Sequence, residues 1–169
     1  MYKIYIYIFS FSILSAQASF NITNLSTNAD KAYDVTFADI DNDGDLDIIS
    51  ASYEDDKIAW YENNGAADPS FSATTISTSA DGATSVFVAD IDNDGDMDIV
   101  SASEVDDKIA WYENNGAADP SFSATTISTG ADGAQKVFVA DIDNDGDMDI
   151  VSASENDDKI AWYENNGAA

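Results

Sequence analysis

The chain has 169 residues, of which 33 are acidic and 6 are basic, so its formal net charge is −27. Such a surface repels nucleic acid and anionic membranes, which excludes both as partners. The absence of cysteine excludes disulfides, and the absence of histidine removes the most common general base. A hydrophobic content of 44% argues against disorder, so we expect a folded chain that needs counter-ions.

The first eighteen residues have the pattern of a secretory signal peptide. Lys3 precedes an apolar run over residues 4–14, and a small-x-small sequence ends at Ala18. A membrane span needs roughly 20 apolar residues, about twice the length of this run, so insertion into a membrane is not expected. The sequence predicts a signal peptide over residues 1–18 and a secreted or cell-surface chain over residues 19–169.

The rest of the chain repeats one unit three times. Asp39, Asp90 and Asp141 begin the same acidic stretch in successive units, which span residues 20–70, 71–121 and 122–169. The second and third units differ at only four positions of those they share. A fixed period of this length is typical of solenoids and propellers.

Each unit predicts four short strands. In the second unit they are FSATTIST (71–78), SVFVAD (85–90), DIVSAS (98–103) and KIAWYEN (108–114). β-Branched and aromatic residues fill these stretches, and Gly, Asn, Asp and Pro separate them. Because no segment has helical periodicity, we expect an all-β fold.

Four antiparallel strands with a period near 50 residues indicate the blades of a β-propeller, with a stacked β-solenoid as the alternative. Neighbouring blades bury both faces of a blade, which explains adjacent apolar residues such as VFV and IAWY. A propeller ring typically has four to eight blades, so three units are too few to complete one. We therefore expect either a fragment of a longer protein or self-assembly of several chains to complete the ring.

The acidic stretch DIDNDGDLD, residues 39–47, has the composition of a calcium-binding loop. Like charges about 4 Å apart repel by ~4 kcal/mol at a protein surface, so such clustering favours a bound cation. Counted from Asp39, the stretch has carboxylates at positions 1, 3, 5 and 9, a turn glycine at position 6 and a backbone carbonyl to offer at position 7. This set of oxygen ligands suits Ca²⁺ better than Zn²⁺, Cu²⁺ or Mg²⁺. An EF-hand is excluded because Ser50 stands where its glutamate belongs. A solvated acidic turn and a catalytic ion are the alternatives.

The sequence FVADIDNDGDMDIVSAS followed by DDKIAWYEN resembles the FG-GAP/VCBS repeats of secreted proteins, which are related to the integrin α-subunit propeller. The resemblance covers residues 19–169 and implies one Ca²⁺ in each repeat, three in all, bound between the first two strands of a blade. It also implies that each blade starts at VFVAD, so that the third blade lacks its outer strand and residues 20–27 are a spare strand that could fill that place. The ligands that it implies are Asp39, Asp41, Asp43, Asp45 (through its carbonyl) and Asp47; Asp90, Asp92, Asp94, Asp96 and Asp98; and Asp141, Asp143, Asp145, Asp147 and Asp149.

A second candidate surface lies at the opposite ends of the strands. Alternate connections of an antiparallel blade emerge on opposite faces, and the positions that vary among units fall in or beside the connections opposite the acidic loops. The resemblance to integrin α also implies ligand binding on that side, whereas simple drift of exposed turns is the alternative. The candidates for contacts with a ligand are Tyr53, Glu54, Thr84, Ser85, Val105, Gln135, Lys136 and Asn156.

These features predict a secreted, calcium-binding propeller module in which calcium is structural and which mediates adhesion to an extracellular protein or polysaccharide. The alternatives are the propeller portion of a polysaccharide lyase or glycosidase, and a purely structural spacer. An enzyme is not expected because every acidic cluster recurs in all three units, whereas a catalytic site is normally single. The repeated tryptophans, such as Trp60, are expected in the core rather than as sugar-stacking platforms.

Overall fold

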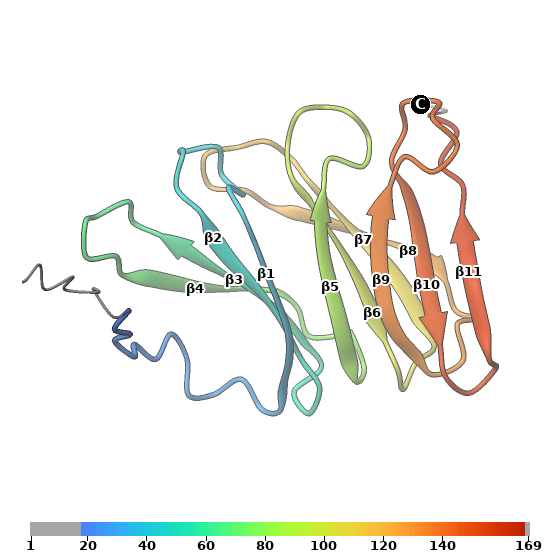
Figure 1. The fold of residues 1–169 in the computed structure, drawn as a ribbon, viewed down its shortest axis with the longest axis horizontal. Helices are drawn as coiled ribbons and strands as arrows, with labels where there is room; N and C mark the ends of the chain where they lie inside the picture. Colours follow the sequence, from blue (N-terminus) through green and yellow to red (C-terminus); the bar gives the residue numbers. More distant parts are fainter. Residues whose placement is uncertain (1–17, 168–169) are drawn as a thin grey trace, which may run out of the picture.

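The computed structural model describes residues 18–167, which form eleven β-strands and no helix (Figure 1). The signal-peptide prediction lies outside the described residues except for Ala18. No helix within residues 18–167 is long and apolar enough to cross a membrane. The strands are β1 (Ala32–Ala38), β2 (Asp47–Ser52), β3 (Lys57–Asn63), β4 (Phe71–Ser77), β5 (Ala83–Ala89), β6 (Asp98–Ser103), β7 (Lys108–Asn114), β8 (Phe122–Ser128), β9 (Ala134–Ala140), β10 (Asp149–Ser154) and β11 (Lys159–Tyr163).

The strands form three antiparallel sheets that follow the repeat. Their orders are β1-β2-β3-β4, β5-β6-β7-β8 and β9-β10-β11, and we call them blades one, two and three. The predicted all-β fold is confirmed, and the three sheets are consistent with part of a propeller. Each four-stranded blade ends with the first strand of the next sequence unit, so blade three has three strands among the described residues.

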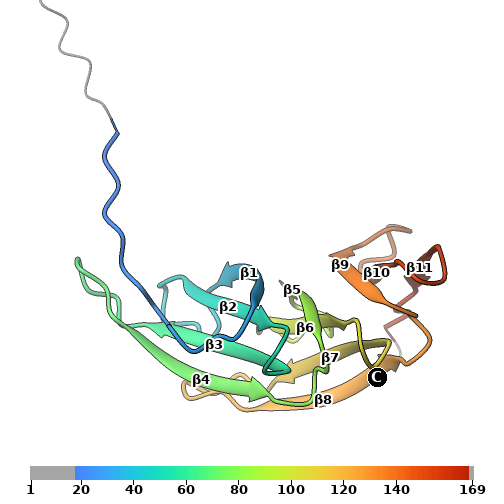
Figure 2. The same ribbon diagram turned by 90° about the horizontal axis from the view of Figure 1, so that it is seen from below.

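The blades stand side by side with their first strands adjacent (Figure 2). Strand β5 contacts both β1 and β9, and the apolar core lies between neighbouring sheets rather than within one. Ile49 and Ile58 of blade one are fully buried against Ala83 and Val86 of blade two. Burial of each such side chain contributes about 1.5–3 kcal/mol, so contacts between blades hold the array together. Trp60 belongs to this core as expected, with 2% of its surface exposed, and Trp111 packs against the second core cluster. For Trp162 the expectation is wrong: it is 49% exposed, because blade three has no neighbour on its outer side among the described residues.

The connections between strands lie on two opposite faces, as expected because alternate connections of an antiparallel blade emerge at opposite ends of its strands. On one face the acidic loop meets the turn between the third and fourth strands: Gly65 packs against the side chain of Asp45. On the other face the β2–β3 turn and the β4–β5 connection meet, because Gly82 packs against Tyr53 and Val105. We call these the acidic-loop face and the opposite face.

Candidate metal centre

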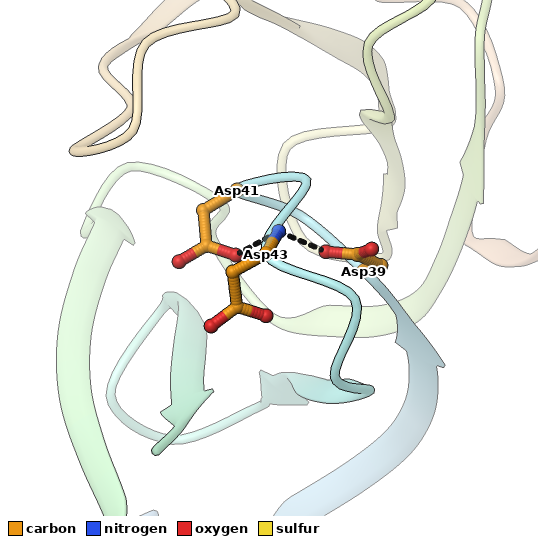
Figure 3. Close-up of side chains that lie close together, drawn as sticks. All are labelled: Asp39, Asp41 and Asp43. Atoms are coloured by element: carbon orange, nitrogen blue, oxygen red, sulfur yellow. Dashed lines mark hydrogen bonds between the residues drawn. The ribbon is translucent and has the colours of Figure 1, made fainter. Parts of the chain in front are cut away.

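Three groups of aspartates gather at the acidic-loop face, one in each blade. In every group the carboxylates of positions 1, 3 and 5 each offer an oxygen, and these oxygens lie within 4.8 Å of one another. Figure 3 shows the first group, in which the carboxylates of Asp39 and Asp41 lie on either side of the Asp43 amide. The structure therefore brings together the first three predicted ligands of each loop. The groups are Asp39, Asp41 and Asp43; Asp90, Asp92 and Asp94; and Asp141, Asp143 and Asp145.

The loop backbone holds these carboxylates in place. The amide of Asp43 donates to Asp39 Oδ1 at 3.0 Å and to Asp41 Oδ1 at 3.2 Å (Figure 3). The amide of Gly44 donates to Asp39 Oδ2 at 3.0 Å. Asn42 and Gly44 take φ angles of 59° and 97°, in the left-handed region that Asn and Gly adopt most readily. The asparagine and glycine thus turn the chain so that alternate aspartates converge.

The carboxylates of the seventh-position aspartates bond outside the cluster, and ligation of a cation through their backbone carbonyls stays a prediction. In blade two, Asp96 Oδ1 accepts a 2.7 Å hydrogen bond from Asn42 Nδ2 of blade one. In blade three, Asp147 Oδ1 accepts a 2.9 Å bond from Asn93 Nδ2 of blade two. These bonds link successive acidic loops, which gives the fourth-position asparagine a second role that the sequence analysis missed. Its signal was present, because all three loops read DNDG at this point.

The ninth-position aspartates are fully buried at the base of the loops. Asp47 accepts the amide of Asn63 on Oδ1 at 2.7 Å and that of Ile40 on Oδ2 at 3.2 Å. These bonds fasten the loop to the end of β3. Each carboxylate oxygen keeps a second lone pair, so coordination of a cation by this residue stays a prediction.

Burial disfavours the charged form of these ninth-position carboxylates. Burial between two blades raises the pKa of Asp98 to about 6, although the amide of Asn114 acts in the opposite direction. In the end blade, burial also acts to raise the pKa of Asp149, but the amides of Asn165 and Ile142 outweigh it and the pKa is lowered. The difference follows from position, because Asp98 has a blade on each side and Asp149 has one.

The charged form is also disfavoured at the third-position aspartates, which lie nearer the surface. Burial, followed by repulsion from neighbouring carboxylates, raises the pKa of Asp41, Asp92 and Asp143. A divalent cation among the carboxylates would relieve that repulsion. The donors are all oxygen atoms, which fits Ca²⁺ and does not fit the softer metals that prefer nitrogen and sulfur.

The candidate residues of the opposite face are divided by the structure. Thr84 and Ser85 are buried, with 2% and 0% of their surfaces exposed, because β5 is packed between β1 and β9. They therefore cannot contact a ligand directly in this arrangement. Gln135 and Lys136 on β9 are half-buried. Exposed or half-buried positions in the β2–β3, β6–β7 and β10–β11 turns are taken by Tyr53, Glu54, Val105 and Asn156.

Comparison with known proteins identifies the repeat. The sequence profile of the FG-GAP-like repeat matches residues 39–101 and again residues 95–152, and together these matches cover more than half of the chain. Each match includes at least one complete acidic loop. A comparison with curated proteins found no match. Repeats of this type are generally non-catalytic and typically extracellular or on a cell surface. The chain belongs to the FG-GAP-like repeat family.

Proposed function

We propose that the chain is a secreted repeat module whose three acidic loops each bind one structural Ca²⁺. The observation that carries the proposal is the threefold recurrence of the converging aspartates in one register, with 4.8 Å or less between their oxygens. A solvated acidic turn has no need of such convergence. The backbone amides already fix the carboxylates, so little order remains to be imposed when the cation binds.

The proposed ions would supply much of the stability of the fold. Extracellular calcium modules bind with Kd values of ~10⁻⁴ to 10⁻³ M. A tenfold excess of Ca²⁺ over such a Kd stabilises the folded chain by about 1.4 kcal/mol at each site. Three sites would contribute ~4 kcal/mol of a total that is typically 5–15 kcal/mol. In this role the cation neutralises carboxylates and orders the loops, and no chemical step is required of it.

Calorimetric titration with calcium tests the proposal. We expect three sites in the parent chain and two in the Asp92→Asn variant, because the substitution removes one carboxylate from the middle group. Asp119→Asn is the matched control: it makes the same change of charge at an exposed residue in the turn between β7 and β8. Three sites should remain in the control. Equal stoichiometry in the two variants would show that the loops are not the sites.

A binding role for the opposite face is the second part of the proposal. Unit one places an aromatic pair there: the rings of Tyr33 and Tyr53 stack with centroids 5.9 Å apart, and Lys31 Nζ lies 3.7 Å from the Tyr53 ring centroid. Stacked tyrosines beside a cation form a platform suited to a sugar or to a protein loop. We propose adhesion to an extracellular polysaccharide or protein through this face.

A glycan and matrix-protein array, probed in calcium, tests the adhesive role. Replacement of Tyr53 by Glu, the residue of the matching position Glu104, should abolish binding to any ligand that the parent chain retains. The control Thr74→Ser alters an exposed residue of β4, outside the aromatic pair. Retention of binding by the Tyr53→Glu variant would remove this role for the face.

A further inference from the structure

We infer that two copies of the chain close into one ring, in which residues 20–27 of each copy form the outer strand of blade three of the other. The partner is thus a second copy of this chain, bound end to end at two equivalent junctions. The inference is independent of calcium binding by the loops. It rests on five features of the two open ends.

The first feature is the path by which the chain enters each blade. Lys108 Nζ donates to the carbonyl of Ser79 at 2.6 Å, and Lys159 Nζ donates to that of Gly130 at 2.8 Å. Both carbonyls lie just after the outer strand of the preceding blade. Lys57 Nζ makes the matching bond to the carbonyl of Asn28 at 3.4 Å, although no blade precedes it among the described residues. Residues 20–27 therefore arrive where the outer strand of a preceding blade would end.

The second feature is the match between a free segment and a free edge. Residues 20–27 read FNITNLST and align with FSATTIST of β4 and β8, yet they form no strand here. Strand β11 has no neighbour on its outer side among the described residues, whereas β3 and β7 pair with β4 and β8. Those pairs place Ala59 opposite Thr75 and Ala110 opposite Thr126. The same register places Ala161 opposite Asn24 of the second copy.

The third feature is a cavity of about 470 Å³ between blades two and three. Apolar side chains that include Trp111, Met148 and Ile150 line it. At the junction of blades one and two, Phe122 of β8 packs against the corresponding core cluster. Among the described residues, blade three has no outer strand to bring such a phenylalanine. Phe20 aligns with Phe122 and is 90% exposed, so it is the side chain that fits this cavity.

The fourth feature is the exposure of the two end faces. Val35 and Phe37 of blade one are 66% and 69% exposed, whereas Val86, which aligns with Val35, is 3% exposed. At the other end, Ile160 is 75% exposed, whereas the matching Ile58 is completely buried. These surfaces correspond to the two sides of the internal junctions. Docked on each other, they would repeat a junction that the chain already makes twice.

The fifth feature is a hydrogen bond that occurs at both internal junctions. Asn114 Nδ2 donates to the carbonyl of Ile40 at 2.9 Å, and Asn165 Nδ2 donates to that of Ile91 at 2.9 Å. The corresponding donor of blade one is Asn63, whose side chain makes no bond between blades among the described residues. The corresponding acceptor of blade three is the carbonyl of Ile142, a residue that is 44% exposed. A second copy would bring this donor and acceptor together.

The blade count favours a second copy over closure of one chain on itself. Rings typically have four to eight blades, so the three blades of the described residues are too few and the six of two copies lie within the range. The contact is head to tail, and a head-to-tail contact gives a closed assembly when its rotation completes a circle. Two copies with two identical junctions satisfy this condition when each copy spans half of the circle.

The mass of residues 19–169 in calcium and moderate salt, measured by light scattering, tests the inference. We expect twice the mass of one chain. Phe20→Asp should give a monomer with unchanged circular dichroism, because Phe20 is 90% exposed in the single chain. The matched control is Thr23→Asp in the same segment, since its counterparts Thr74 and Thr125 are exposed in their strands. The control should remain a dimer. A monomeric parent chain, or an open-ended polymer, would overturn the inference.

A cross-link between copies tests the strand register separately. The chain contains no cysteine, so Asn24→Cys and Ala161→Cys can be made singly and mixed. Opposed residues of antiparallel strands have Cα atoms about 4.5–5.5 Å apart, within the range that a disulfide spans. Mild oxidation of the mixture should give a covalent dimer. A mixture of Asn21→Cys with Ala161→Cys, out of register, should not. Failure of the first pair to cross-link would contradict the exchange of strands.

Discussion

Lys136 Nζ lies 2.6 Å from Asp34 Oδ2, so an ion pair joins the third blade directly to the first. Ser85 of the middle blade donates to the same carboxylate oxygen at 2.9 Å. Asp34, Ser85 and Lys136 hold the same position in the three repeats, yet each has a different side chain. Sequence differences at this position therefore create a polar connection across all three blades.

Removal of this ion pair should weaken the array. Lys136→Ser introduces the residue found at the matching position of blade two, so it should fold without strain. We expect a loss of about 1 kcal/mol in the free energy of unfolding, as is typical for a partly exposed pair. Denaturant melts of Lys136→Ser, Asp34→Ser and the double variant give the coupling energy. Strictly additive losses would show that the pair contributes nothing.

The same carboxylate should make stability sensitive to acid. Burial acts to raise the pKa of Asp34, but hydrogen bonds from Lys136 and Ser85 outweigh it and leave the pKa below its usual value of 3.8. The unfolded chain then binds the proton more tightly, so the contribution is present above the usual pKa and is lost as the pH falls through the lowered one.

The pH prediction is measured by the difference in melting temperature between the parent chain and Asp34→Asn. We expect the parent to be the more stable at about pH 6, and the difference to shrink toward about pH 3. Comparison of the two chains removes the effect of protonation at the acidic loops, which both share. A difference that stays constant over this range would contradict the assignment.

The turn beside each acidic loop should tolerate only glycine. Gly116 has a φ of 64°, and a Cβ there would collide with the Asp96 carboxylate. We expect Gly116→Ala to cost about 1–2 kcal/mol from the backbone conformation alone, and more if Asp96 must move. Gly130→Ala is the control, because its nearest contact is at 3.9 Å and the matching residue of the second sequence unit is Ser79. Equal thermal stability of the two variants would refute the packing argument.

The strands could be predicted from the sequence because each unit alternates short β-rich runs with turn residues. The bounds of β6 and β7 agree with the expected 98–103 and 108–114. Strand β5 begins at Ala83, two residues earlier than expected, because Ala83 pairs with Ser103 beyond a register shift. A register shift of that kind depends on the partner strand and cannot be predicted from the local sequence pattern.

The converging aspartates were also predictable, since their spacing fixes which carboxylates share a side of the loop. The burial of Thr84 and Ser85 was not, because it depends on how closely β9 and β1 approach β5. Residues 20–27 have the composition of a β-strand but form no strand in this structure. A strand at a sheet edge needs a neighbour to bond with, and its own sequence does not provide one.

The melting temperature of residues 19–169, with calcium and with excess chelator, tests the central claim most directly. Because the carboxylates of the three loops repel one another, we expect chelation to lower the midpoint steeply, by an amount that corresponds to ~4 kcal/mol. Readdition of Ca²⁺ should restore the original midpoint, and an equal concentration of Na⁺ should not. Identical melts with calcium and with chelator would contradict a structural role for the ion.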